Sequence, residues 1–247
     1  MAEHLTPVRR QIVVPVAPPV AFEAFTDDIG AWWPLARHSV YGAGSTVSFV
    51  NGQLVEVSPE GPSVWGTVLD WDPPHRFRMT WHAGTDPADA TEVCVRFDEV
   101  GSHTLVTLEH TGWERRADAF AARSGYAGGW VGVLDAFSTR AAASAVGATD
   151  DDPVWLALSH TPGPDVPDDV FADPRLRDHF AFVSTLKIEG VLVGAGPMEG
   201  QKGQGMTIVR TTPDAVASYV HRAQTDDRAV TAGLFDVDIA VWNVQLS

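Results

Sequence analysis

Apolar and polar residues alternate over short segments in the first half of the chain. In one such segment Phe77, Met79 and Trp81 share one face, while Arg78 and Thr80 share the other. Strict alternation is typical of a strand with one packed and one solvated face, as in antiparallel sheets. Further strands are predicted at residues 9–16, 46–49, 54–57, 64–71, 93–97 and 105–110. The pattern therefore predicts one antiparallel sheet.

Two helices accompany these strands. Pro18 and Pro19 open a short helix, because proline is favoured in the first turn of a helix. A longer helix is predicted over residues 125–146, where apolar side chains recur at helical spacing: Trp130, Val133, Leu134, Phe137 and Ala141. The order strand, helix, many strands, long helix indicates an α+β domain.

The second half of the chain follows another order. Strands are predicted at residues 154–159, 191–195, 206–210 and 235–244, with helices at 171–189 and 213–222. This βαββαβ order is ferredoxin-like. In the first of these helices we expect Leu176, Phe180, Val183 and Leu186 to form the buried stripe, with His179 on the same face.

A domain boundary is predicted between the two halves. The stretch from Gly147 to Pro153 contains three consecutive aspartates and small residues, which form poor helix or strand interiors. We therefore expect two domains, residues 1–147 and 151–247.

Composition narrows the classes of function. The net charge is −15 and both halves are acidic, with no basic stripe, so binding to nucleic acid or to an anionic membrane is not expected. No apolar run is long enough to span a bilayer, and the N-terminus lacks the apolar run of a secretory signal. The single cysteine, Cys94, allows no internal disulfide. These features predict a cytoplasmic protein.

Tryptophan is concentrated in the first domain, which holds seven of the nine. A buried indole N–H requires a hydrogen-bond partner. So many indoles in one small domain predict a partly hydrated cavity rather than a dry core.

Several motifs carry a resemblance to a known family over about residues 8–146. They are PPVAFEAFT (18–26), AWWP (31–34), GQLVE (52–56), WGTV (65–68), MTW (79–81), HTGW (110–113) and YAGGW (126–130). Together they resemble the bacterial SRPBCC proteins of the Hsp90-ATPase-activator-homologue type. The resemblance implies a helix-grip fold, in which a curved antiparallel sheet wraps a long C-terminal helix and leaves a pocket between them. On this arrangement we expect the pocket to bind a small apolar molecule through Trp33, Trp81, His110, Trp113, Tyr126 and Trp130.

Other chemical signals in this domain are weak. His110 shares a strand face with Val106 and Leu108, where a histidine is usually a hydrogen-bonded core residue. Glu56 and Glu109 have no partner recognisable in the sequence. No His-Glu-x-x-His or Cys-x-x-Cys motif is present, so neither a metal nor another cofactor is expected.

The second domain resembles the YCII-related proteins over about residues 153–246. The matching pieces are RDH (177–179), EGVLVGAGP (189–197), DRAVTAGL (227–234) and VW (241–242). The resemblance implies a ferredoxin-like fold that forms a homodimer, and a catalytic pair that corresponds to His179 and Asp227. Arg228 departs from the pattern, because that family usually has proline there.

Three functions remain open at this point. The protein is an enzyme-like binder of a small organic molecule, with a metal-independent lyase or hydrolase reaction that uses His179 and Asp227 as acid and base. Alternatively, it is a non-catalytic carrier of such a molecule. The third alternative is an interaction module of the co-chaperone type.

Overall fold

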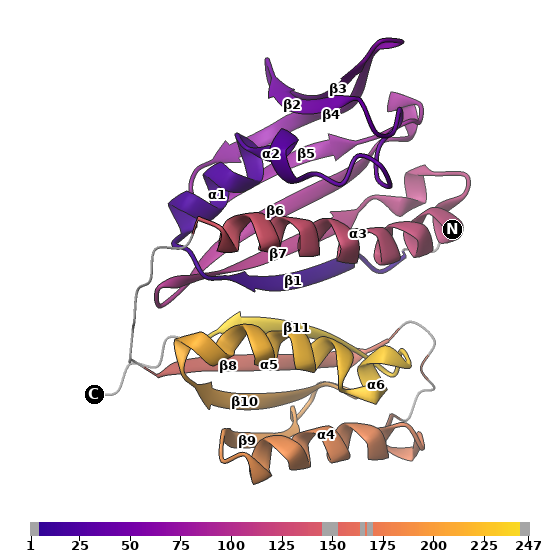
Figure 1. Ribbon diagram of the computed structural model, residues 1–247. Coiled ribbons are helices and arrows are strands. Elements are labelled where there is room, and N and C mark those ends of the chain that lie inside the picture. The colour runs from indigo at the N-terminus through magenta and orange to yellow at the C-terminus, as the bar shows by residue number, and fades with distance from the viewer. Residues whose placement is uncertain (1–4, 145–152, 164–165, 167–169, 243–247) are drawn as a thin grey trace. The chain divides into compact units, whose positions relative to one another are not determined.

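The computed structural model describes residues 5–144, 153–163, 166 and 170–242 (Figure 1). The chain divides into two compact units, Met1–Ala148 and Thr149–Ser247. The predicted boundary stretch at 147–153 lies almost entirely outside the described residues. Each unit is therefore described by itself.

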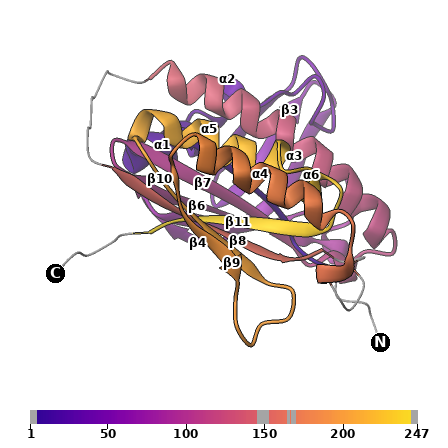
Figure 2. The same cartoon turned by 90° about the horizontal axis from the view of Figure 1, so that it is seen from below.

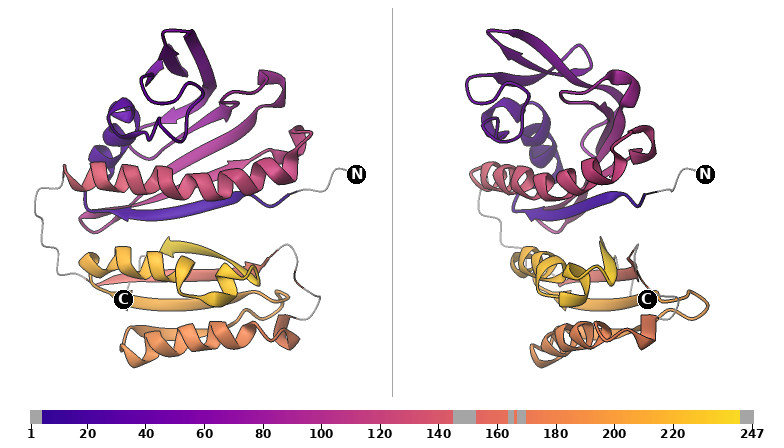
Figure 3. Two further views of the ribbon diagram at one scale, coloured as in Figure 1. Left: turned by 45° about the vertical axis from the view of Figure 1, so that its right-hand side comes forward. Right: turned by 90° about the vertical axis from the view of Figure 1, so that its right-hand side faces the viewer.

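Unit 1 contains a seven-stranded antiparallel sheet in the order β1-β7-β6-β5-β4-β3-β2. Its elements are β1 (Val8–Val14), α1 (Pro18–Thr26), α2 (Ile29–Trp32), β2 (Thr46–Val50), β3 (Gln53–Ser58), β4 (Gly61–Asp72), β5 (Arg76–Trp81), β6 (Thr91–Val100), β7 (His103–Thr111) and α3 (Ala119–Ala142). The sheet curves over α3, which lies along β1 (Figure 3). All strands predicted from alternation are present, and the sheet and long helix form the predicted helix-grip arrangement.

The core of unit 1 lies between the sheet and the helices. The apolar face of β5 contributes Phe77, Met79 and Trp81, each at most 5% exposed, as the alternation predicts. From α3, Leu134 and Phe137 reach the same cluster. Burial of large aromatic side chains contributes several kcal/mol each at about 25 cal/mol per Å².

The helix α3 begins six residues before the predicted start at Gly125. The prediction rested on the apolar stripe from Trp130 to Ala141, which gives no signal for residues 119–124. The preceding residues Ala119 and Ala122 pack against the core, so tertiary contacts extend the helix. The predicted end at Val146 lies outside the described residues.

Unit 2 contains a four-stranded antiparallel sheet in the order β11-β8-β10-β9. Its elements are β8 (Val154–Pro162), α4 (Leu176–Ile188), β9 (Leu192–Pro197), β10 (Gly205–Thr211), α5 (Pro213–Thr225), α6 (Arg228–Thr231) and β11 (Phe235–Val241). Both long helices cover the same face of this sheet (Figure 2). The predicted order of strands and helices is present, with the short α6 added before the last strand.

The helix α4 differs from the prediction in its start and in its buried face. It begins at Leu176 rather than Phe171, because Pro174 cannot continue a helix and the residues before it form only a short 3₁₀ turn. Phe180 is 59% exposed, whereas Phe182 is buried. The inward face is thus rotated toward Phe182, and the assignment of Phe180 to the core was wrong.

Candidate functional site

A partly open cavity of about 420 Å³ lies within unit 1. Its wall is formed by the segment after α2, by residues of β4 and β5, and by one face of α3. The lining residues are Trp33, Arg37, His38, Ser39, Val40, Trp65, Trp81, Ala83, Gly84, Tyr126, Gly129, Trp130 and Val133. The cavity lining therefore combines a group of aromatic side chains with a short polar segment, 37–39.

The aromatic rings of the wall form one contiguous group. The ring centroids of Trp33 and Trp65 are 5.2 Å apart, as are those of Trp81 and Trp130. Tyr126 stacks on Trp130 with a centroid distance of 6.1 Å. Such spacing is typical of favourable aromatic pairs, so the wall is held rigid before any ligand arrives.

The indole N–H groups of the wall are all bonded to protein. They donate as follows: Trp33 to the His38 carbonyl, Trp65 to Glu56 Oε2, Trp81 to the Tyr126 hydroxyl and Trp130 to His110 Nδ1. These groups therefore give no reason of their own to expect water in the cavity, and its partial hydration stays a prediction. What the indoles offer to the cavity is their carbon surface.

His110 lies behind the wall rather than on it. Its side chain is fully buried on β7 and does not line the cavity. Trp130 donates to Nδ1 over 3.0 Å, so Nδ1 carries no proton, and Nε2 lies 2.7 Å from Thr91 Oγ1. The Thr91 hydroxyl donates in turn to the Trp81 carbonyl, so Nε2–H is the donor to Thr91.

This arrangement keeps His110 neutral. Burial first, and Arg116 second, lower the pKa of His110 to about 3. Trp113 is also fully buried, and its indole donates to the His110 carbonyl over 3.0 Å. The structure thus places His110 and Trp113 in the layer that supports Tyr126 and Trp130, away from the cavity surface.

Glu56 on β3 is a buried carboxylate with four donors. Its oxygens accept from the backbone N–H groups of Val40 and Tyr41, from the Ser45 hydroxyl and from the Trp65 indole. Burial raises the pKa of Glu56, but these hydrogen bonds together outweigh it, and the net pKa is lowered. Glu56 therefore ties the segment after α2 to the cavity wall.

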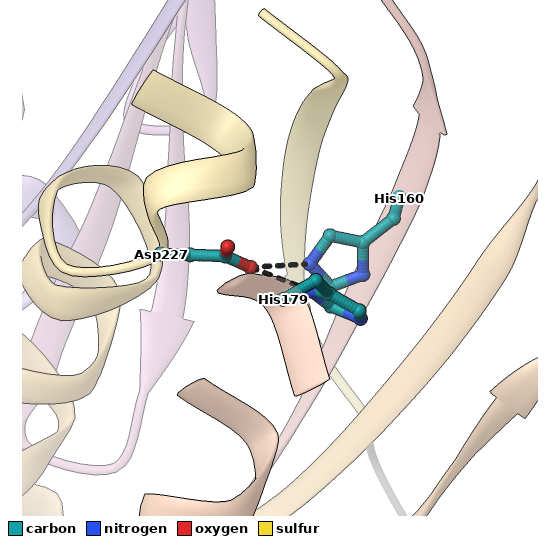
Figure 4. A group of neighbouring side chains, drawn as sticks. All are labelled: His160, His179 and Asp227. Carbon is teal, nitrogen blue, oxygen red and sulfur yellow. Dashed lines mark hydrogen bonds and ion pairs between the residues drawn. The ribbon is translucent and has the colours of Figure 1, made fainter. Parts of the chain in front are cut away.

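His179 and Asp227 lie together in unit 2, as Figure 4 shows. His179 Nδ1 is 2.6 Å from Asp227 Oδ2, within hydrogen-bonding reach. The Asp227 side chain is fully buried, while that of His179 is 12% exposed. The pair therefore has one side open to solvent.

The local fold explains how Asp227 is held. It is the N-cap residue of α6, and its Oδ1 accepts from the Ala229 N–H over 3.0 Å. This leaves Oδ2 for His179. Arg228 is the first residue of α6, a position where proline is favoured but not required, so the departure at this position does not prevent the cap.

A second histidine, His160 on β8, reaches the same carboxylate. Its Nε2 lies 3.9 Å from Asp227 Oδ2, and its side chain is 1% exposed. Burial first, then the neighbouring His179, lower the pKa of His160 to about 4, which Asp227 and the Leu158 backbone only partly oppose. The sequence analysis missed His160, although its alternation with Leu156 and Leu158 on β8 marks it as inward-facing.

The comparisons with known proteins identify unit 1. The family model described as activator of Hsp90 ATPase homolog 1-like protein (AHSA1) matches residues 15–141, just over half of the chain. The chain belongs to this family. No curated protein matches the AHSA1-like chain significantly.

Solved structures similar to the AHSA1-like unit include a synthase and a dimer. The anthrahydroquino-gamma-pyrone synthase Txn09 is 32% identical, over 57% of this chain and 99% of its own, with a TM-score of 0.38. CalU16 from Micromonospora echinospora is 20% identical, over 54% and 72%, with a TM-score of 0.38. The Aha1 dimer from Colwellia psychrerythraea is 20% identical, over 54% and 97%, with a TM-score of 0.35. Because these TM-scores are low, the assignment to the family rests on the family model.

The AHSA1-like cavity contains four of the six predicted residues: Trp33, Trp81, Tyr126 and Trp130. The polar lining residues Arg37, His38 and Ser39 were missed, since they lie in an aperiodic segment without any motif. Glu56 carried a usable signal, because it stands two residues after Leu54 on the buried face of β3. A polar residue in an apolar alternation marks a buried, partnered group.

In the described part of the chain, no helix has the length and apolar character of a membrane span.

Proposed function

We propose that the AHSA1-like unit binds a small, largely apolar organic molecule in its aromatic cavity. The observation that carries this proposal is a cavity of about 420 Å³ whose wall is made of tryptophan ring faces with every indole N–H already bonded to protein. Such a wall favours apolar or aromatic surface, and the volume lies within the ordinary range for small-molecule sites.

The polar groups at the cavity define where a ligand's oxygen would lie. The Tyr126 hydroxyl accepts from Trp81, which leaves its own hydrogen to donate to a ligand. Arg37 and His38 belong to the polar segment of the lining. His38 is held neutral, because burial and then Arg37 lower its pKa. We therefore favour a molecule with an aromatic body and at least one hydrogen-bond-accepting oxygen.

Blocking the cavity should abolish binding without removing any aromatic residue. Ala83 lines the cavity, and Ala83→Phe places a ring inside it. We expect affinity for the fluorescent probe 1-anilinonaphthalene-8-sulfonate to fall at least about tenfold, equivalent to about 1.4 kcal/mol. The measurement is a fluorescence titration of the full chain, with native mass spectrometry of the same preparations to detect a molecule that purifies with the wild type.

The matched control is Ala88→Phe, since Ala88 is exposed and is not part of the cavity lining. This variant should bind the probe as the wild type does. Equal affinity in both variants would show that the probe binds elsewhere. A folded protein with no affinity for apolar aromatics would favour the interaction-module alternative.

We further infer that unit 2 is a ferredoxin-like, YCII-related domain with His179 and Asp227 as an acid–base pair. The βαββαβ order and the 2.6 Å separation of the two side chains support this inference. A carboxylate fixes the tautomer of an imidazole, which can then exchange a proton at its other nitrogen with a substrate. Sheet-to-sheet homodimerisation stays a prediction from the same resemblance.

The pair can be tested by proton NMR of the metal-free full chain. A His179 Nδ1–H held 2.6 Å from a carboxylate should give a protected, strongly downfield resonance. Asp227→Asn should remove it, whereas Asp226→Asn should leave it, because Asp226 is adjacent but exposed and does not contact His179. A resonance that survives Asp227→Asn would refute the pair.

A further inference from the structure

His160 is a buried group that the proposed acid–base pair leaves unexplained. Within the described part of the chain, neither of its ring nitrogens has a partner that meets hydrogen-bonding geometry, although the Leu158 backbone lies near enough to favour the protonated ring. An unsatisfied buried polar group costs about 1–3 kcal/mol, so native proteins rarely keep one without a bound water or ion. The contrast with His110 is direct, because His110 is as deeply buried and has both nitrogens bonded.

The surroundings of His160 are those of a three-ligand site. His160, His179 and Asp227 each offer one donor atom, and these atoms all lie within 4.8 Å of one another (Figure 4). A tetrahedral ion with bonds of about 2.0–2.2 Å places neighbouring ligand atoms about 3.3–3.6 Å apart. The separations from Asp227 Oδ2 are 2.6 Å to His179 and 3.9 Å to His160, which lie on either side of that value. Small ring rotations would therefore complete the geometry.

The supporting residues are also arranged as a metal site requires. The three ligands come from β8, α4 and the N-cap of α6, so the packing of separate elements fixes their positions. Asp227 Oδ1 is oriented by the Ala229 N–H, which presents Oδ2 to the two imidazoles. The centroid of the Phe235 ring lies 5.7 Å from that of the His160 ring and 5.2 Å from that of the His179 ring. Phe235 therefore covers the three side chains with apolar surface.

We propose that His160, His179 and Asp227 bind one divalent transition-metal ion. Two imidazoles and one carboxylate suit Zn²⁺ or Fe²⁺, whereas Mg²⁺ and Ca²⁺ require mostly oxygen ligands. The side chains of His160 and Asp227 are buried, and that of His179 is 12% exposed. The fourth coordination position of the ion would therefore face solvent on the His179 side, where water or a substrate oxygen would bind.

This site goes beyond the cavity of the AHSA1-like unit and is independent of it. It also extends the pair, because the ion occupies the place that the shared proton holds in the metal-free protein. A metal-bound water would then carry the proton that the imidazole carries otherwise.

The test is zinc binding by the full chain. After removal of metal with a chelator, isothermal titration with Zn²⁺ at neutral pH should give one site per chain. Co²⁺ in its place should give the visible absorption of a tetrahedral ion. His160→Gln should weaken Zn²⁺ binding at least about a hundredfold, since it removes a direct ligand. His221→Gln is the control, because His221 is exposed on α5 and is not part of the group.

Each outcome decides the proposal. Absence of stoichiometric Zn²⁺ binding, or equal affinity in His160→Gln and wild type, would overturn it. If His160→Gln does not fold by circular dichroism, His179→Gln provides the same test at the most exposed ligand. The acid–base pair fails separately, through its NMR resonance in the metal-free protein. A wild type that binds no Zn²⁺ but keeps that resonance would leave the pair standing and end the metal site.

Discussion

Lowering the pH from 6.5 to about 3 is expected to remove about 4 kcal/mol from the free energy of unfolding of the AHSA1-like unit through His110 alone. In the folded unit the pKa of His110 is about 3, against 6.5 for the free side chain. Between these values the unfolded chain binds a proton that the folded unit excludes. The stabilisation that comes from neutral His110 is therefore complete above pH 6.5 and is lost as the pH falls toward 3.

The hydrogen bonds of His110 explain why the fold excludes this proton. Nδ1 is occupied by the Trp130 N–H, so protonation there would set two N–H groups against each other. Loss of that hydrogen bond would release Trp130, which belongs to the cavity wall. We therefore expect ligand affinity and stability to decline together on acidification.

The measurement is chemical denaturation followed by tryptophan fluorescence between pH 7 and 5, a range that precedes most carboxylate titration. His110→Gln should be less stable at pH 7 by about 2–3 kcal/mol, because its neighbours lose their partners, and should show a flatter pH dependence. His103→Gln, on the same strand but only half-buried, should keep the wild-type slope. His38 contributes in the same direction, so the slope of His110→Gln should be reduced rather than zero. An unchanged slope in His110→Gln would contradict the assignment.

Periodicity predicted the faces of strands far better than the partners of polar groups. Alternation along β7 placed His110 inward with Val106 and Leu108, and the structure agrees. It could not show that Thr91 and Trp130 bond to the ring, because these residues come from β6 and α3, and such contacts depend on tertiary packing. The alternation along one strand therefore predicts that a histidine is buried, but it does not predict whether that histidine lines a cavity or packs behind the cavity wall.

The same limit applies to the second unit. The match to a family motif predicted that His179 and Asp227 belong together, and the structure brings them to 2.6 Å. The motif says nothing of His160, whose inward direction follows from alternation but whose distance from Asp227 depends on how α6 packs on α4, α5 and β11. The error at Phe180 has a related cause, since helical spacing alone allowed two neighbouring faces of α4 to be read as buried.

Replacing Glu56 by glutamine should destabilise the AHSA1-like unit by about 3 kcal/mol. The four donors around the carboxylate would meet one oxygen and one NH₂ group, so at least one buried donor would face another donor. Because two of these donors are the Val40 and Tyr41 amides, the cavity segment after α2 would lose its attachment to β3. Denaturation should show the loss of stability, and hydrogen exchange should show faster exchange of both amides.

The pH dependence of the wild type offers an independent check on Glu56. Its pKa is lowered in the folded unit, so its stabilisation is complete above the free value of 4.5 and disappears as the pH falls through the folded pKa. The His110 effect begins at higher pH, near 6.5, and continues down to about pH 3, so below pH 4.5 the two effects overlap and the Glu56 part is obtained by comparing Glu56→Gln with the wild type. Glu109→Gln is the matched control, because Glu109 is 38% exposed and makes a 3.7 Å surface ion pair with Arg9, worth less than about 1 kcal/mol. Equal losses in the two variants, or unchanged exchange of Val40 and Tyr41 in Glu56→Gln, would show that the carboxylate does not hold the cavity segment, and the preformed wall on which ligand binding depends would need another cause.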